Sequence, residues 1–170
     1  MTENTIDPFG DSFKGGGAGR ERTFFKPEDF VSSPVLMIEV KGVRPEANNP
    51  FFDEAEPEGP RNSRTRLEVD ARITSFPSPE ALEAGEGQEK PNITLNQTYL
   101  ASDLKDSLGK VEVYKIHLQP NKNPKRKASW VWRGVDGKLV EQVKAYYVKR
   151  EEAVAEALAG DDTPAYLRGA

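Results

Sequence analysis

The segment from residue 64 to 76, RTRLEVDARITSF, constrains the fold more than any other part of the sequence. Apolar residues alternate with charged ones along it: Leu67, Val69, Ala71 and Ile73 against Arg66, Glu68, Asp70 and Arg72. This period of two is typical of an antiparallel strand with one face in the core and the other in water. A single strand is not stable alone, so the rest of the chain must supply its partners.

Four further segments have the length and composition of strands: residues 35–43, 93–100, 110–120 and 130–135. Residues 101–109 predict a short helix between the third and fourth strands, and residues 138–158 predict a longer amphipathic one. The first three strands have no crossover segment between them, which favours an antiparallel sheet. The order predicts a mainly β fold, an OB-fold-like barrel of five antiparallel strands with a C-terminal helix.

We expect one folded domain at residues 23–158. The Gly-rich residues 1–22 predict a disordered N-terminal arm, and residues 159–170 a flexible tail. Two long acidic loops, residues 44–63 and 77–92, interrupt the domain, because their prolines disfavour regular strand pairing.

Composition excludes several kinds of chemistry. The chain has no cysteine and one histidine, His117, which excludes disulfides, thiolate zinc sites, cysteine nucleophiles and any site with two imidazoles. The acidic residues of 53–58 lie in a loop without the spacing of a metal-ligand set. We therefore expect no enzyme activity, no metal and no cofactor.

Charge is distributed unevenly along the 170 residues. The net charge is −4, but residues 110–150 contain eleven Lys and Arg against three acidic residues, a net +8. The remaining residues therefore carry −12. This division indicates a basic binding segment within an acidic chain.

The basic segment also contains aromatic residues. Four cations in the turn at residues 121–129 directly precede Trp130 and Trp132, whose indoles point to the same side of a strand. Proteins hold single-stranded nucleic acid with cations that follow the phosphates and aromatic rings on which bases stack. The candidate nucleic-acid-binding residues are Lys115, Lys122, Lys125, Arg126, Lys127, Trp130, Trp132, Arg133, Tyr114, Arg64, Arg66 and Phe52.

Each candidate also has a purely structural interpretation. Trp130 and Trp132 are equally consistent with core residues, and the basic turn with a solvated hairpin tip. Phe51 and Phe52 are adjacent in a polar loop, so at least one is a candidate contact, or else the two anchor the loop. Arg64 and Arg66 share a strand face that suits phosphates or ordinary solvent.

Several motifs recur in the same order in a known group of proteins. They are DPFG at residues 7–10 with the Gly-rich arm, FKPEDF at 25–30, VLMIEV at 35–40, RTRLEVDARI at 64–73, TYLASDLKDSLGK at 98–110, NPKRKASWVW at 123–132 and KAYY at 144–147. With these motifs the chain resembles the single-stranded DNA-binding proteins encoded by phages of actinobacteria. The resemblance implies an OB-fold that coats single strands during phage replication and recombination.

The sequence thus predicts a sequence-independent single-stranded DNA-binding protein that acts as a homo-oligomer, with replication or recombination proteins as further candidate partners. The alternative is a phage structural or adaptor protein whose β-barrel makes protein contacts. No apolar run reaches the roughly 20 residues of a spanning helix, and the N-terminus does not resemble a signal peptide. We therefore expect no membrane partner and a cytoplasmic location, in the host cell if a phage encodes the protein.

Overall fold

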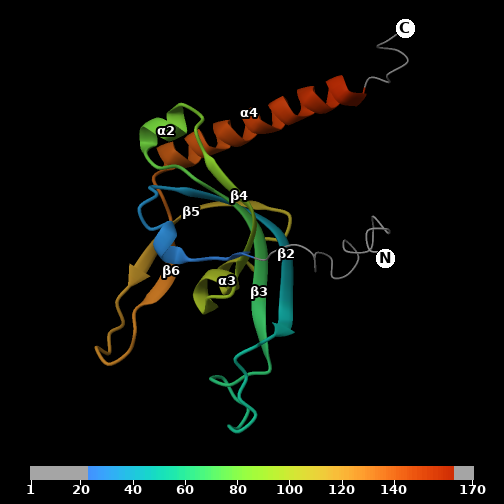
Figure 1. The fold of residues 1–170 in the computed structure, drawn as a ribbon. Helices are drawn as coiled ribbons and strands as arrows, with labels where there is room; N and C mark the ends of the chain where they lie inside the picture. Colours follow the sequence, from blue (N-terminus) through green and yellow to red (C-terminus); the bar gives the residue numbers. More distant parts are fainter. Residues whose placement is uncertain (1–22, 163–170) are drawn as a thin grey trace.

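The computed structural model describes residues 23–162, and within the last turn of the final helix only side chains up to residue 159. The fold is mainly β: a curled, open sheet of six strands with a long C-terminal helix (Figure 1). The strand order across the sheet is β1-β4-β3-β2-β5-β6. The strands are β1 (Thr23–Phe24), β2 (Leu36–Asn48), β3 (Thr65–Ser75), β4 (Gln88–Leu95), β5 (Val111–Gln119) and β6 (Ser129–Arg133).

Helices cover both faces of this sheet. Phe25 and Phe30, which flank the 3₁₀ turn η1 (Pro27–Asp29), and helix α3 (Thr98–Leu104) contribute to the larger core cluster on the inner face. Helices α2 (Pro79–Glu83) and α4 (Gly137–Asp162) contribute to the smaller cluster on the outer face. Strand β2 is therefore buried on both faces at its start, which explains its continuous apolar run.

The expectation of five strands is wrong, because the short strand β1 makes a sixth. Its two residues pair in parallel with Ile93 and Thr94 of β4. The next residue, Phe25, donates its backbone N–H to the Thr94 carbonyl and packs its ring 5.9 Å from Trp132 of β6. The segment thus extends the sheet beyond β4 and packs against β6, the strand at the opposite edge of the sheet.

The two loops expected at 44–63 and 77–92 are shorter than predicted. Strand β2 continues through Pro45 to Asn48, and β4 already begins at Gln88 and passes through Pro91. Both prolines lie where the pairing with β3 shifts register, so their missing N–H removes no ladder hydrogen bond. The second loop also contains α2, whose cap Ser78 accepts from the backbone N–H of Ala81.

The predicted third strand, 93–100, also differs from the structure. It ends at Leu95, and α3 spans Thr98–Leu104 rather than 101–109. Leu100, Ala101 and Leu104 are buried on one side of this helix at three- and four-residue spacing. The helix between the third and fourth expected strands, the fourth and fifth strands and the C-terminal helix are confirmed. Helix α4 extends to Asp162, beyond the expected 158, whereas the predicted arm at 1–22 and residues 163–170 of the tail lie outside the described residues.

Candidate nucleic-acid interface

The loop between β5 and β6 carries the densest exposed positive charge of the predicted set. Lys122, Lys125, Arg126 and Lys127 are all exposed, and among residues 23–159 none of them has a carboxylate within ion-pair distance. The loop is shaped by its asparagines. The Asn121 side chain accepts from the backbone of Asn123 at 2.9 Å, and the Asn123 side chain accepts from Lys125 at 3.0 Å. These Asx turns hold the cations on a pre-formed loop without neutralising them.

Trp132 is a core residue in the structure. It is only 8% exposed, and its indole N–H donates to the Leu100 carbonyl of α3 at 3.1 Å. Tyr114 stacks against it with ring centroids 5.9 Å apart. Burial, together with the charges of Glu112 and Asp103, raises the pKa of the Tyr114 hydroxyl. Of the two interpretations left open by the sequence, the core one holds for Trp132, so it has no free face for a base.

Trp130 occupies the edge of the same cluster. It is half-buried and lies opposite Leu118 in the β5–β6 register, on the same strand face as Trp132. Part of its indole remains accessible at the β6 end nearest the basic loop. The prediction that both indoles face one side is confirmed, but only Trp130 has surface left for contact.

Lys115 and Arg133 lie on the other face of the same hairpin. They are directly opposite in the register and both exposed, which places two like charges side by side. Arg133 donates to the side-chain oxygen of Gln119 at 2.8 Å rather than to an acid. Facing like charges cost stability in a sheet, and a bound anion would relieve that cost.

A second group of candidates surrounds the start of β3. The Arg66 guanidinium lies close to two phenylalanine rings, 5.7 Å from the Phe24 centroid and 5.8 Å from that of Phe51. The Arg64 guanidinium lies 4.4 Å from the Phe52 centroid. Phe51 is 80% exposed and Phe24 40%. We call Phe24, Phe51, Phe52, Arg64 and Arg66 the arginine–aromatic ladder.

The charges of the ladder are largely neutralised. Arg66, 18% exposed, pairs with Glu68 at 3.0 Å, and Arg64 pairs with Glu58 at 3.4 Å. Glu68 is itself buried and also accepts from Arg44 at 2.9 Å. The hydrogen bond to Asp70 comes first among the effects that raise the pKa of Arg44, opposed by burial. The ladder therefore offers flat stacking surfaces rather than net positive charge.

The loop between β2 and β3 that carries Phe51 has a defined shape. Asn62 donates from its side-chain amide to the carbonyls of Asp53 and Glu56, and it accepts from the Asp53 backbone at 2.8 Å. The Asn49 side chain accepts from the backbone N–H of Phe51 at 3.0 Å. The expectation of a loop is confirmed for residues 49–64, and these bonds fix its aromatic tip.

The bend of β2 brings both loops to one side of the molecule. A register shift between Val40 and Gly42 marks a bulge, and bulges bend the strand that carries them. The β2–β3 and β5–β6 loops both project from the lower side of the curled sheet in Figure 1, with α3 between them. Phe24, Arg66, Lys115 and Arg133 lie on strand faces opposite to the inner core residues Phe25, Leu67, Ile116 and Trp132.

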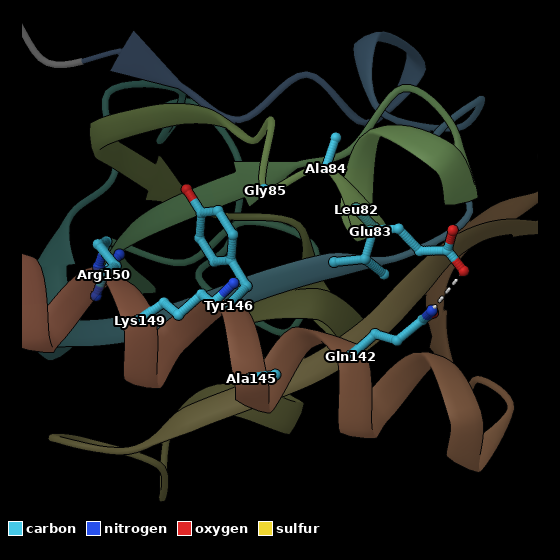
Figure 2. Close-up of a pocket in the computed structure, with 9 residues that line it drawn as sticks. All are labelled: Leu82, Glu83, Ala84, Gly85, Gln142, Ala145, Tyr146, Lys149 and Arg150. Carbon is cyan, nitrogen blue, oxygen red and sulfur yellow. Dashed lines mark hydrogen bonds between the residues drawn. The ribbon is translucent and has the colours of Figure 1, made fainter.

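A cavity of about 530 Å³ lies elsewhere, between α4 and the α2–β4 turn (Figure 2). Most of its polar side chains bond to one another or to the sheet. Gln142 donates to Glu83 at 3.2 Å, Tyr146 to Glu89 at 3.0 Å, and Arg150 to Glu39 at 2.7 Å. Lys149 lines the rim. These bonds dock α4 onto the sheet and give the cavity a structural role.

Sequence reasoning missed Phe24 and chose Phe52 where Phe51 is the exposed ring. Phe24 was hidden because β1 has only two residues and no alternation to read. For two adjacent phenylalanines in a loop, the sequence does not indicate which side chain points toward the solvent. Arg64 and Arg66 were found from their shared strand face, but the sequence showed neither the acids that pair with them nor the rings beside them.

No family model, curated protein or solved structure matches the chain. Within residues 23–162, no helix is both long and apolar enough to cross a membrane. In the same described part, no three His, Asp or Glu side chains are grouped as a metal-binding set would be.

Proposed function

We propose that this chain is a sequence-independent single-stranded DNA-binding protein of the OB-fold type. The observation that carries the proposal is the β5–β6 loop, which presents four exposed cations without an ion-pair partner among the described side chains, on the same side of the molecule as the ladder. Phosphate attraction and base stacking are the two interactions that single-strand binders combine. Neither requires recognition of base edges, so the binding is indifferent to sequence.

The topology supports the OB assignment. Without β1, the strand order is β4-β3-β2-β5-β6, with a bent β2 pairing on both sides and a helix between β4 and β5. In OB-folds the ligand lies across the second and third strands and the loops that join strands one to two and four to five. Here these features are β3, β4 and the two loops described above. As the resemblance to phage proteins implies, the role would be to coat single strands in replication and recombination.

The binding residues divide into two groups with different physics. Lys122, Lys125, Arg126 and Lys127, with Lys115 and Arg133, supply phosphate contacts whose strength falls with salt. Phe51, Phe24 and the accessible part of Trp130 supply stacking, worth about 1–3 kcal/mol per base.

Fluorescence anisotropy with a labelled oligodeoxythymidine of about 30 nucleotides tests the proposal, with the matched duplex as competitor and a mixed-sequence strand as comparison. We expect tight binding of both single strands, weak binding of the duplex, and weakening with salt. Absence of binding to any single strand at low salt would refute the proposal.

A protein-contact module is the second candidate, because Trp132 is in the core and the ladder arginines are already paired with acids. The same titration separates the two candidates, since a protein-contact module would leave the anisotropy of every oligonucleotide unchanged.

A further inference from the structure

The only histidine of the chain lies on the same face of the β5–β6 hairpin as two of the proposed phosphate contacts. His117 of β5 is two residues from Lys115 and two from Gln119, so these three side chains share one strand face, opposite to that of the core residue Ile116. In the register, His117 lies opposite Val131 of β6. His117 is half-buried, so part of its surface is accessible to a ligand.

The Arg133 side chain extends past the position of His117 on this face. Its backbone is paired with Lys115, on one side of the histidine, but its guanidinium donates to the side-chain oxygen of Gln119, on the other side, at 2.8 Å. Neighbouring side chains on one strand face are about 7 Å apart along the strand. A phosphate beside His117 is therefore also within reach of the Lys115 ammonium and the Arg133 guanidinium.

This part of the hairpin contains no acid. The sequence from residue 113 to 135 has no Asp or Glu. The acids at its two ends are already hydrogen-bonded: Glu112 accepts from the Ser107 hydroxyl, and Asp136 accepts from the backbone N–H of Lys138 at 3.3 Å. The histidine therefore lies among cations along the hairpin.

Within residues 23–159, no other element brings a carboxylate to the histidine. Strand β2 pairs with β5 only up to Tyr114, so β2 does not run beside His117. Helix α4 packs on the outer face of the sheet, and the acid of its first turn, Glu141, pairs with Lys144 at 3.7 Å. Among the described side chains, no carboxylate lies within ion-pair distance of His117 or of its two cationic neighbours.

The charge of a histidine depends on pH in the range where lysine and arginine stay charged. Histidine ordinarily gains its proton between about pH 8 and 5. A charged imidazole has two N–H donors and would add a third cation to Lys115 and Arg133. Three cations at one place repel one another, and a phosphate between them replaces that repulsion with attraction. By linkage, a ligand that favours the protonated histidine binds more tightly as the pH falls.

We propose that His117 is a proton-dependent phosphate contact, which makes the affinity for single-stranded DNA rise as the pH falls from about 7.5 to about 5.5. This inference rests on the proposed function and adds a form of regulation to it. Lys115 and Arg133 hold the phosphate at both pH values, and His117 joins them when it is charged. The contact is made with the DNA backbone, so the pH changes the affinity for every base sequence alike.

Anisotropy titrations of the full chain with oligodeoxythymidine at the two pH values test the proposal. The wild-type affinity should be roughly 2- to 5-fold higher at the lower pH, as expected for one exposed ion pair. The slope of log K against log salt should be steeper by about 0.7, as expected for one more phosphate contact. His117→Gln should lose both differences. His117→Lys is charged at both pH values, so it should bind tightly at both.

A matched control moves the imidazole to another surface. His117→Gln with Lys149→His has one histidine on α4, at the rim of the cavity in Figure 2 and away from the hairpin. This variant should bind with the same affinity at both pH values. Both positions are solvent-accessible, so circular dichroism should show the native fold in every variant.

Proton NMR follows the same residue directly, because a single imidazole gives a single Hε1 resonance. With saturating oligodeoxythymidine, this resonance should change from its neutral to its charged position at a higher pH than without the strand. Absence of binding at every pH would refute the proposed function. Binding with the same pH dependence in the wild type and in His117→Gln, or an Hε1 titration that the strand does not move, would overturn this inference alone.

Discussion

Replacement of the four loop cations is the most direct perturbation of the proposed binding site. In the variant with Lys122, Lys125, Arg126 and Lys127 all changed to Gln, the loop keeps Asn121 and Asn123, whose side chains shape it. The fold should therefore be retained, and the melting temperature should stay close to that of the wild type. Only the electrostatic part of the affinity changes.

The size of the effect follows from the number of loop cations replaced. Each phosphate neutralised on a single strand contributes about 0.7 to the slope of log K against log salt, so four contacts contribute about 2.8. Between about 50 and 200 mM salt, those contacts account for a loss of roughly 50-fold in the affinity of the wild-type protein. The quadruple variant should lack this part of the salt dependence, and its affinity should differ most from that of the wild type at low salt.

Anisotropy titrations with oligodeoxythymidine at several salt concentrations measure both slopes. A matched control replaces Lys138 and Lys149 with Gln, because these exposed cations lie on α4 and away from both loops. The control should keep the wild-type slope. The reasoning is refuted if the quadruple variant keeps the full slope, or if the control lowers it as much per charge.

Three further outcomes follow from single side chains. Phe51→Ala should weaken oligonucleotide binding by about 5- to 150-fold, the equivalent of one stacked base, with the salt slope unchanged; a lowered slope in the same titrations would contradict a stacking role. Trp132→Ala should lower the free energy of unfolding in urea by about 3–5 kcal/mol, because it removes a buried core side chain. Trp130→Ala should lower it by less, because that indole is only half-buried. Equal losses of stability in the two variants would contradict the different burial of the two indoles. Burial raises the pKa of Glu39, but the hydrogen bonds and charge of Arg150 outweigh it and lower the pKa below the ordinary 4.5. The stability from this pair is therefore present above pH 4.5 and lost as the pH falls below it, and Glu39→Gln should flatten that part of a urea-midpoint profile; an unchanged profile would refute the assignment.

The strand content was predictable where burial is one-sided or continuous. The alternation of Leu67, Val69, Ala71 and Ile73 located β3, since a half-buried strand has period two. Prolines misled the prediction at both long loops, because a proline removes a ladder bond only where the ladder is regular. Pro45 and Pro91 both lie at register shifts, and such shifts depend on the partner strand. The residue pattern of a single strand therefore cannot show where the register shifts.

Residue types predicted which side chains belong to the candidate site. They did not predict how deeply each side chain is buried or which residues pair with it. The four cations of the β5–β6 loop were found because they lie within six consecutive residues, 122–127, of a polar turn. Trp132 was ambiguous because a strand face alone does not say whether core or solvent lies beyond it. Its burial comes from Phe25 and Leu100, which are distant in sequence. The same holds for Arg66, since only the folded chain places Glu68 and the two phenylalanine rings around it.

A chain with a net charge of −4 can bind a polyanion because charge acts locally in salt. At 0.1 M salt the Debye length is about 10 Å, so the four loop cations act on a phosphate largely independently of acids farther away. The acids near the ladder are also paired with arginines, which limits their field. At about 0.01 M salt the Debye length grows to about 30 Å. The net charge of −12 carried outside residues 110–150 then also repels the phosphates. The gain in affinity on dilution of salt should therefore flatten toward low ionic strength, where a uniformly basic binder would continue to gain.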